Sequence, residues 1–459
     1  MTTARARVAS AATGFPRRWW KHAPTTILSI WAAAWPFAPS AQDLRLQVPG
    51  RGAEPSRGLA EPAQLTLRDA LALTFDRNPS LAAFTKEREA AEAAASQAGA
   101  LPNPVLDVTA DNLRNARKAE AGDRSTTIQI GQLVELGGKR GARQGVAVAS
   151  RDLAAWDYEA RRIELAAQAA QRFVDLLEAQ QRRALAEESL ELARQVGDTV
   201  AKRVQAGKVS PVEETKARLA QAGAGVELEQ ATRELNAARR ALGALWANPD
   251  PRFERAVGDL EGPLQLPAWD HLSGRVRDNP GLARWSSEVA RRRAGLDVES
   301  AKAFPDVTVT AGVTRFSQFD DRAWSVGVSI PLPLFDRNRG AILEASRRLA
   351  KAGDEYRAEE SRLLAELSQA YERLAAIIRE IEVLRATLLP GARSAFEAAA
   401  TGYELGKFGF LDVLDAQRTL FQTQTQYLRA LADGQRGVSE IERLVGGPLN
   451  PSSDNRSKP

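Results

Sequence analysis

The chain has 459 residues, 26% of them charged, and carries a formal net charge of +5 without any cysteine. The missing cysteines exclude disulfides and a lipid-modified N-terminal cysteine, and His271 is the one histidine beyond the first 41 residues, so soft-metal and imidazole sites are not expected. Five of the 63 basic residues lie in residues 1–41, which leaves 58 basic against 58 acidic residues, and nucleic-acid binding is therefore not expected.

Residues 1–41 have the pattern of a secretory signal peptide. Basic side chains come first, an apolar run from Thr25 to Ala38 follows, and small residues close it at Ser40 and Ala41. The run is too short to cross a bilayer, which disfavours the alternative of a single membrane anchor. Residues 42–63 and 447–459, rich in Pro, Gly and Ser, are interpreted as an N-terminal linker and a C-terminal tail.

The rest of the chain repeats itself once. Asn78-Pro79 recurs 201 residues later as Asn279-Pro280, and Gly207-Lys208 recurs 199 residues later as Gly406-Lys407. Repetition at a long period indicates a duplicated architecture. The prediction is a first repeat at 64–246, an equatorial linker at 247–266 and a second repeat at 267–446.

Each repeat begins with a helical stretch, residues 66–101 and about 267–303, and continues into a strand hairpin, 104–136 and 305–336. In the hairpins apolar residues alternate with small polar ones, as in barrel strands of roughly ten residues. The predicted lipid-facing residues of the second hairpin are Val307, Val309, Trp324, Val326 and Val328. Alternation by itself leaves open a soluble hairpin with one buried face.

A long helix and a return helix complete each repeat. Leu363, Leu367, Ala370 and Leu374 are spaced 4, 3 and 4 residues apart, and this spacing is the seam of a left-handed coiled coil. A helix over 141–205 would measure ~98 Å at 1.5 Å per residue. The first stretch 66–101 and the return helix 212–246 would measure ~54 Å and ~52 Å, so stacked end to end they match it.

Four strands cannot enclose an open lumen, and an open sheet edge cannot face lipid. Three copies would supply twelve strands, enough for a closed barrel with an aqueous bore. The predicted fold is therefore a membrane α/β protein with four barrel strands per chain. Its trimeric 12-stranded outer-membrane β-barrel continues into a long antiparallel coiled-coil α-helical tunnel, and each chain is internally duplicated.

Three motifs stand out: Gln132–Arg140 and Ile330–Gly340 at the strand-to-helix joins, and Gly402–Gln417 at the second helical turn. With these motifs the chain resembles the TolC-like outer-membrane efflux protein family, in its heavy-metal resistance–nodulation–division pump branch. The resemblance covers nearly the whole mature chain. It implies a homotrimer in the outer membrane of a Gram-negative bacterium, with the tunnel in the periplasm.

The resemblance also implies roles for individual residues. Asp412 and Asp415, three apart on one helix face, match the aspartates of the periplasmic gate, and Tyr403 matches a clasp residue there. Phe408 stands where an Arg clasp is expected, and the first repeat has Glu213 and Lys216 in place of the two aspartates. The implied adaptor-contacting tips are Gly207, Lys208, Gly406 and Lys407.

The implied function is a passive duct, without cofactor or enzymatic activity, for substrates from an inner-membrane resistance–nodulation–division pump and a periplasmic adaptor (membrane fusion) protein. Heavy-metal cations are the expected substrates, and the barrel is expected to contact outer-membrane lipid. A duct for drugs, solvents or type I secreted peptides remains an alternative. A periplasmic coiled-coil scaffold is the alternative from another class.

Overall fold

A computed structural model of the chain describes residues 61–111, 124–316 and 321–449, all within one compact unit, Gly58–Pro459. The expected signal peptide 1–41 lies outside these residues, as do 42–60 of the expected linker and 450–459 of the expected tail.

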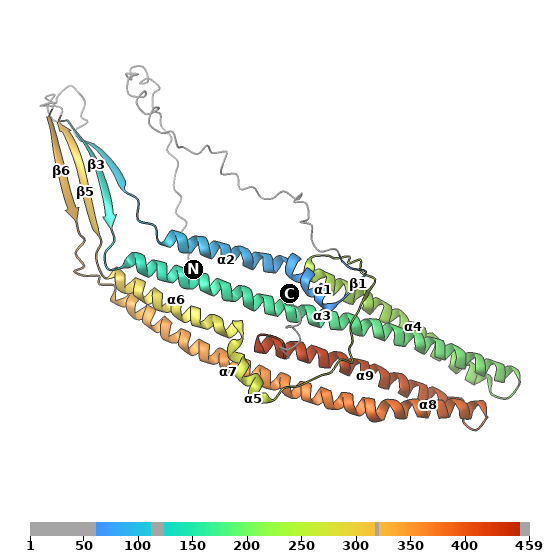
Figure 1. Cartoon of the computed structure of the whole chain (residues 1–459). Helices are drawn as coiled ribbons and strands as arrows, with labels where there is room; N and C mark the ends of the chain where they lie inside the picture. The colour runs from blue at the N-terminus through green and yellow to red at the C-terminus, as the bar shows by residue number, and fades with distance from the viewer. Residues whose placement is uncertain (1–60, 112–123, 317–320, 450–459) are drawn as a thin grey trace, which may run out of the picture. The chain divides into compact units, whose positions relative to one another are not determined.

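The two repeats meet in one antiparallel sheet of four strands (Figure 1). Its order is β2 (Val105–Asp111), β3 (Ser125–Val134), β5 (Val307–Phe316) and β6 (Asp321–Ser329). The central pair β3–β5 joins the first hairpin to the second, from Ser125 opposite Phe316 to Val134 opposite Val307. The predicted strand hairpins are thus confirmed, and each contributes two strands to a shared sheet.

The two faces of the sheet differ as the alternation predicts. On one face Val313 lies between Ile128 and Trp324, and Val309 lies opposite Val328. This face is open: Trp324 is 85% exposed and Val326 81%. The other face carries hydroxyl groups, including Thr127 and Thr314, whose oxygens are 3.0 Å apart. A large apolar patch left in the open indicates a surface that lipid or another protein covers.

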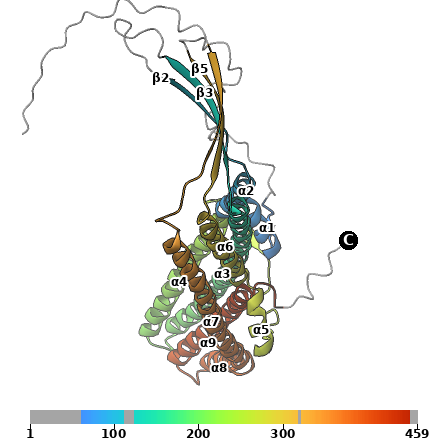
Figure 2. The same ribbon diagram turned by 90° about the vertical axis from the view of Figure 1, so that its left-hand side faces the viewer.

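The helices following β3 and β6 are the longest elements (Figures 1 and 2). The first is α3 (Lys139–Gln205); the second repeat has α7 (Arg339–Val383), a π-helical segment Leu384–Leu388 and α8 (Leu389–Glu404). On α7 the seam residues Leu363, Leu367, Ala370 and Leu374 are all buried, which confirms the coiled-coil periodicity. The α3 helix packs against α1, α2, α4, α6 and α9.

The return helices are α4 (Pro211–Gly243), continued by a 3₁₀ turn Ala244–Trp246, and α9 (Phe410–Val445). Ser210 caps α4 because its side chain accepts a hydrogen bond from the Val212 amide, and Pro211 suits the first helical position. Leu428 and Leu431 of α9 join Phe173 and Leu176 of α3 in the largest buried apolar cluster.

The helical stretches predicted at 66–101 and 267–303 are not continuous. The first consists of α1 (Leu67–Arg77) and α2 (Pro79–Ala98), and the second of α5 (Trp269–Arg275), a 3₁₀ turn Val276–Asp278 and α6 (Pro280–Lys302). Asn78 and Asn279 interrupt them with extended backbone. The reason is local: a following proline disfavours the helical conformation, and asparagine caps the next helix.

These two asparagines also hold the stacked helices together. The Asn78 side-chain amide donates to the Leu245 carbonyl at the end of the first return helix, at 2.7 Å. Asn279 donates in the same way to the carbonyls of Arg443 and Leu444, at 3.0 and 2.9 Å. Each joint places the first helices of a repeat against the end of its return helix, which confirms the predicted end-to-end arrangement beside the long helix.

In the segment between the repeats, β4 (Arg255–Ala256) pairs in parallel with β1 (Gln64–Leu65), which lies at the start of the first repeat. Glu61 anchors this region: its carboxylate accepts hydrogen bonds from Trp246 Nε1, Asn248 Nδ2 and the Arg252 amide, at 2.6–2.8 Å. These contacts pin the chain before the first repeat to the end of that repeat.

Candidate functional site at the helical tips

The turns that join the long helices to the return helices have the same geometry in both repeats. Gly207 and Gly406 have φ of 69° and 73°, the left-handed region that favours glycine. The Lys208 amide donates to the Arg203 carbonyl and the Lys407 amide to the Gly402 carbonyl, at 2.9 and 2.8 Å. This pattern terminates a helix at a glycine. All four predicted tip residues are exposed.

Tyr403 connects the two tips within one chain. It is 4% exposed, although it lies in the last turn of α8. The Arg203 guanidinium of α3 lies 4.3 Å from the centre of its ring and donates to its backbone carbonyl. Its hydroxyl donates to Glu213 Oε2 of α4 at 3.2 Å. We call Arg203, Glu213 and Tyr403 the tip latch.

An apolar cluster surrounds the tip latch. Phe410 at the start of α9 lies 6.0 Å from the Tyr403 ring and joins Val200, Ala217 and Val413 in a buried group. Burial, and next the negative charge of Glu213, raise the pKa of Tyr403 above its ordinary value. The hydroxyl therefore stays protonated, and able to donate to Glu213, throughout the physiological pH range.

The two aspartates predicted for the gate, Asp412 and Asp415, lie in the first turns of α9 and are exposed. Asp412 Oδ2 accepts a hydrogen bond from the Gly409 amide at 2.8 Å, so this carboxylate also caps the helix. Asp415 lines a groove of about 1190 Å³ that Lys216 also lines. The groove thus brings together two positions that the 199-residue offset relates.

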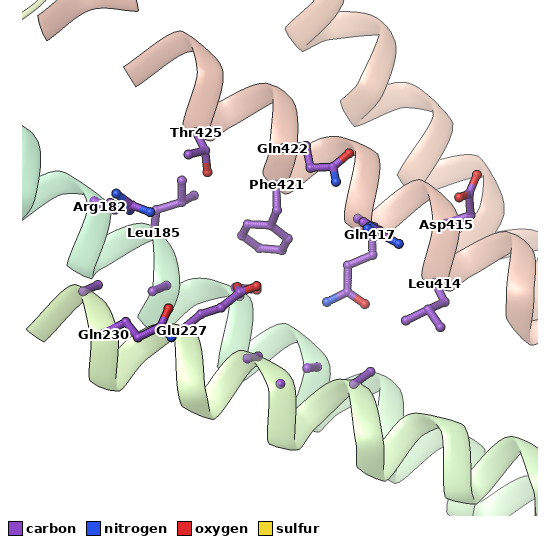
Figure 3. Close-up of a pocket in the computed structure, with 18 of the residues that line it drawn as sticks. Arg182, Leu185, Glu227, Gln230, Leu414, Asp415, Gln417, Phe421, Gln422 and Thr425 are labelled. Atoms are coloured by element: carbon purple, nitrogen blue, oxygen red, sulfur yellow. The ribbon is translucent and has the colours of Figure 1, made fainter. Parts of the chain in front are cut away.

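That groove runs over α3, between α4 and α9 (Figure 3). The Phe421 side chain of α9 projects into it, and Glu227 and Gln230 of α4 lie across from it. Its walls are mixed in polarity, with Arg418 and Arg429 beside Leu414 and Leu219. Because charged and polar side chains line the groove beside apolar ones, it is a surface for water or for another helix and not a closed apolar cavity.

Phe408, at the place of the expected Arg clasp, has a packing role. A Cβ added to Gly402 would lie 2.1 Å from the Phe408 ring, so the ring rests directly on the glycine backbone. An arginine does reach Tyr403, but it is Arg203 from the other repeat. The sequence interpretation missed Arg203 and Glu213 as partners of Tyr403. The sequence feature that could have indicated this contact is that Arg203 and Glu213 lie at the two helix ends on either side of the first tip.

The glycine-rich motif at the first strand-to-helix join is structural. Gly137 and Gly138 have positive φ, and Lys139 forms an ion pair with Asp306 at 2.7 Å. Glu135 and Arg143 form a second ion pair beside it. The Lys139–Asp306 pair ties the start of α3 to the residue before β5, and the Glu135–Arg143 pair ties it to the residue after β3.

The described ranges contain no group of three or more His, Cys, Asp or Glu side chains placed to hold a metal ion. Within the same ranges, no helix combines the length and apolarity needed to cross a bilayer. His271 is exposed on α5.

Comparisons with known proteins agree with this architecture. The sequence profile of the family described as "Outer membrane efflux protein" matches twice, at residues 70–248 and 276–447. The cobalt-zinc-cadmium resistance protein CzcC of Cupriavidus metallidurans is 40% identical over 83% of this chain and 90% of its own length. The nickel-cobalt-cadmium resistance protein NccC of Alcaligenes xylosoxydans xylosoxydans is 31% identical over 64% of this chain and 65% of its own.

Among solved structures, the outer membrane protein VceC of Vibrio cholerae has the same fold, with a TM-score of 0.70 and 20% identity over 84% of this chain and 97% of VceC. Proteins of the matching family are channels that form trimers, work with efflux pumps and catalyse no reaction. The two profile matches, the duplicated helices and the shared four-stranded sheet lead to one conclusion: this chain belongs to the outer membrane efflux protein family and is an efflux channel of the Gram-negative outer membrane.

Proposed function

We propose that this channel exports heavy-metal cations as the outer-membrane component of a tripartite system, with an inner-membrane resistance–nodulation–division pump and a periplasmic adaptor. The observation that carries the proposal is the 40% identity to the cobalt-zinc-cadmium resistance protein over nearly the full length of both chains. The chain itself has no cysteine and a single methionine, Met1. Selection among metals is therefore assigned to the pump, and the channel supplies a passive route.

The working form is proposed to be a homotrimer. Strand β2 pairs only with β3, and β6 only with β5, among the strands described. Unpaired backbone groups in hydrocarbon cost several kcal/mol each, so both edges of the sheet need partner strands. Joining β6 of one copy to β2 of the next would close twelve strands without an edge. In that barrel Val307, Val309, Trp324, Val326 and Val328 face lipid.

The tips are proposed to form the periplasmic gate. Three copies would place six carboxylates, from Asp412 and Asp415, around the axis, where they attract cations and repel one another. The tip latch at Tyr403 is proposed to oppose that repulsion because it holds α8, which leads into α9, against α3 and α4. Gly207, Lys208, Gly406 and Lys407, exposed at the turns, are the proposed contacts of the adaptor.

Deletion of the gene, with complementation, tests the substrate. The deletion strain is expected to lose tolerance to zinc, cobalt and cadmium and to accumulate these metals, while its tolerance to drugs and solvents stays unchanged. Complementation with the intact chain restores metal tolerance. Unchanged metal tolerance together with new drug sensitivity would instead establish the alternative duct for drugs and solvents. A soluble periplasmic monomer in fractionation would establish the scaffold.

A further inference from the structure

The segment that joins β6 to α7 exposes large apolar side chains. Leu332, Leu334 and Phe335 are 73%, 66% and 100% exposed, and every residue from 331 to 337 is exposed. We call residues 331–337 the join segment. Its hydrogen bonds to described residues are local, such as the one from the Leu334 amide to the Leu332 carbonyl at 2.8 Å. Large apolar side chains gathered in this way on a surface indicate a contact with another molecule.

The backbone of the join segment is restrained along its length. At one end, β6 finishes at Ser329, the last residue paired with β5. At the other end, Asn338 Nδ2 donates to the Glu299 carbonyl of α6 at 2.7 Å. Between these ends, Pro331 and Pro333 have a fixed φ and no amide donor. The apolar side chains are therefore presented on a restrained backbone, which lowers the entropy cost of forming a contact.

The corresponding segment of the first repeat has a neighbouring strand. At the 199-residue offset, residues 331–333 correspond to residues 132–134, which still belong to β3 and pair with residues 307–309 of β5. The join segment has no such neighbour among the described strands, because β6 is the last strand of the sheet. The first join therefore lies inside the subunit, and the second lies at its edge.

The strands and the helices follow the same lateral order. In the sheet the order is β2, β3, β5 and β6, and among the helices α2 packs against α3, α3 against α6, and α6 against α7 (Figure 1). Each subunit therefore has α2 and β2 along one edge and β6 and α7 along the opposite edge. The join segment connects the two elements of the second edge, and residues 99–104 connect those of the first.

In a closed ring, the join segment would meet residues 99–105 of the next copy. β2 leaves the helices and β6 returns to them, so β6 pairs with the next copy's β2 in the antiparallel sense, and the end of one strand lies beside the start of the other. Residues 99–105 carry no charge, and Leu101 and Val105 are exposed. One contact would thus remove two apolar surfaces from water.

We propose that the join segment is a contact between subunits, in which Leu332, Leu334 and Phe335 pack against Leu101 and Val105 of the neighbouring copy. The contact lies where the barrel strands give way to helices. It closes the seam between subunits at a level where the two prolines have ended strand pairing. The inference rests on the proposed homotrimer and names the residues that hold it together at this level.

Disulfide trapping tests the contact, because the chain has no cysteine of its own. Six double variants of the full-length chain, expressed in the outer membrane, combine L101C or V105C with L332C, L334C or F335C. Oxidation is expected to convert at least one of them into covalent trimers on non-reducing gels. A single cysteine can link only two copies, so each single variant should give dimers at most. A bond within one chain is not expected, because the two edges of the sheet are three strand spacings, ~14 Å, apart, which is beyond the reach of a disulfide.

The outcomes separate this contact from the homotrimer. F335C combined with V212C, at the start of α4 and far from the sheet, should give no covalent trimer. Equal trapping in that control overturns the proposal. Heat-sensitive trimers without covalent trimers in all six double variants also overturn it, and assign the join segment to lipid. A wild-type chain that is a monomer in the membrane overturns the homotrimer as well.

Discussion

At the scale of single residues, the tip latch is the feature that links the structure to the proposed gate. The side chains of Arg203 and Glu213, from the ends of two helices, converge on Tyr403 at the end of a third, and all three residues belong to the same chain. The latch therefore restrains one subunit's own helices, and it acts whether or not neighbouring subunits touch. If the proposed gate is correct, its opening requires these contacts to break in each copy.

Tyr403→Phe tests the latch. The change keeps the buried ring and the stacked Arg203 but removes the hydrogen bond to Glu213, and a hydrogen bond to a charged group contributes about 1.5–3 kcal/mol. The open state is expected to become about tenfold or more populated, seen as larger mean conductance of the purified channel in planar bilayers. Tyr356→Phe on α7 is the control and should leave conductance unchanged. Identical conductance of Tyr403→Phe and wild type would remove the latch from the gating scheme.

Two glutamates near the end of α9 have opposite pH behaviour. The Glu442 carboxylate accepts a hydrogen bond from the Leu449 amide at 3.0 Å, and burial raises the pKa of Glu442. Protonated Glu442 therefore stabilises the fold fully below the ordinary carboxyl pKa of about 4.3. This stabilisation is lost as the pH rises through the higher pKa of the folded state. The hydrogen bond from Arg443 lowers the pKa of Glu440, so its contribution is present above about 4.3 and is lost as pH falls through the lower folded pKa.

Glu442→Gln is therefore expected to raise stability at pH 7 by roughly 1 kcal/mol, because glutamine keeps an acceptor for Leu449 without a buried charge. The gain should vanish below pH about 4. Glu440→Gln should lower stability at pH 7 and lose its effect in acid. Thermal unfolding followed by circular dichroism at both pH values checks the pair. Two variants with the same sign at pH 7 would contradict the assignment.

At the scale of elements, a helix needs glycine where another side chain packs directly against its backbone. Gly402 and Gly391 both belong to α8, but only Gly402 carries a ring on its backbone. The added Cβ at Gly391 meets nothing within 4 Å. Substitutions at Gly402 and Gly391 therefore distinguish the effect of close packing on stability from the effect of helix propensity.

Gly391→Ala is expected to stabilise α8 by up to about 1 kcal/mol, through propensity alone. Gly402→Ala should instead destabilise the protein by about 1–3 kcal/mol, since the Phe408 ring must move. The thermal midpoints of the two variants measure the difference. Adding Phe408→Ala to Gly402→Ala should remove most of the penalty, and additive effects of the two changes would show that the ring and the glycine are not coupled.

At the scale of the whole molecule, the sheet is a shared element with an uncovered apolar face and two free edges among its described strands. A single copy buries neither. Its helices, by contrast, bury their apolar seams within one chain. Assembly in the membrane therefore completes the barrel, while each subunit already contains much of the helical packing.

Val326→Arg tests the lipid-facing assignment at this scale. An arginine at mid-height on the lipid face costs about 2–4 kcal/mol, so fewer heat-resistant trimers are expected in outer-membrane fractions. Ser325→Arg, one residue away on the opposite face, should assemble normally and change ion selectivity of the channel. Equal assembly of both variants would assign Val326 to a surface other than the lipid face.

The duplication, the strands and the long helices were predictable from the sequence because their signals are local. Alternation with period two and a 3.5-residue seam are visible in short windows, and they describe the real faces of β5, β6 and α7. The helix breaks at Asn78 and Asn279 also have a local cause, the proline that follows each asparagine. The sequence analysis predicted continuous helices there because the surrounding residues favour helix.

Only the tertiary structure decided which groups meet. Tyr403 contacts Glu213 and Arg203 across 190 and 200 residues of sequence, and no periodicity records such a pairing. The pairing of β3 with β5 likewise unites the two repeats in one sheet. The physical reason is that periodicity fixes the face on which a side chain lies, whereas its partners depend on how separate elements pack in three dimensions.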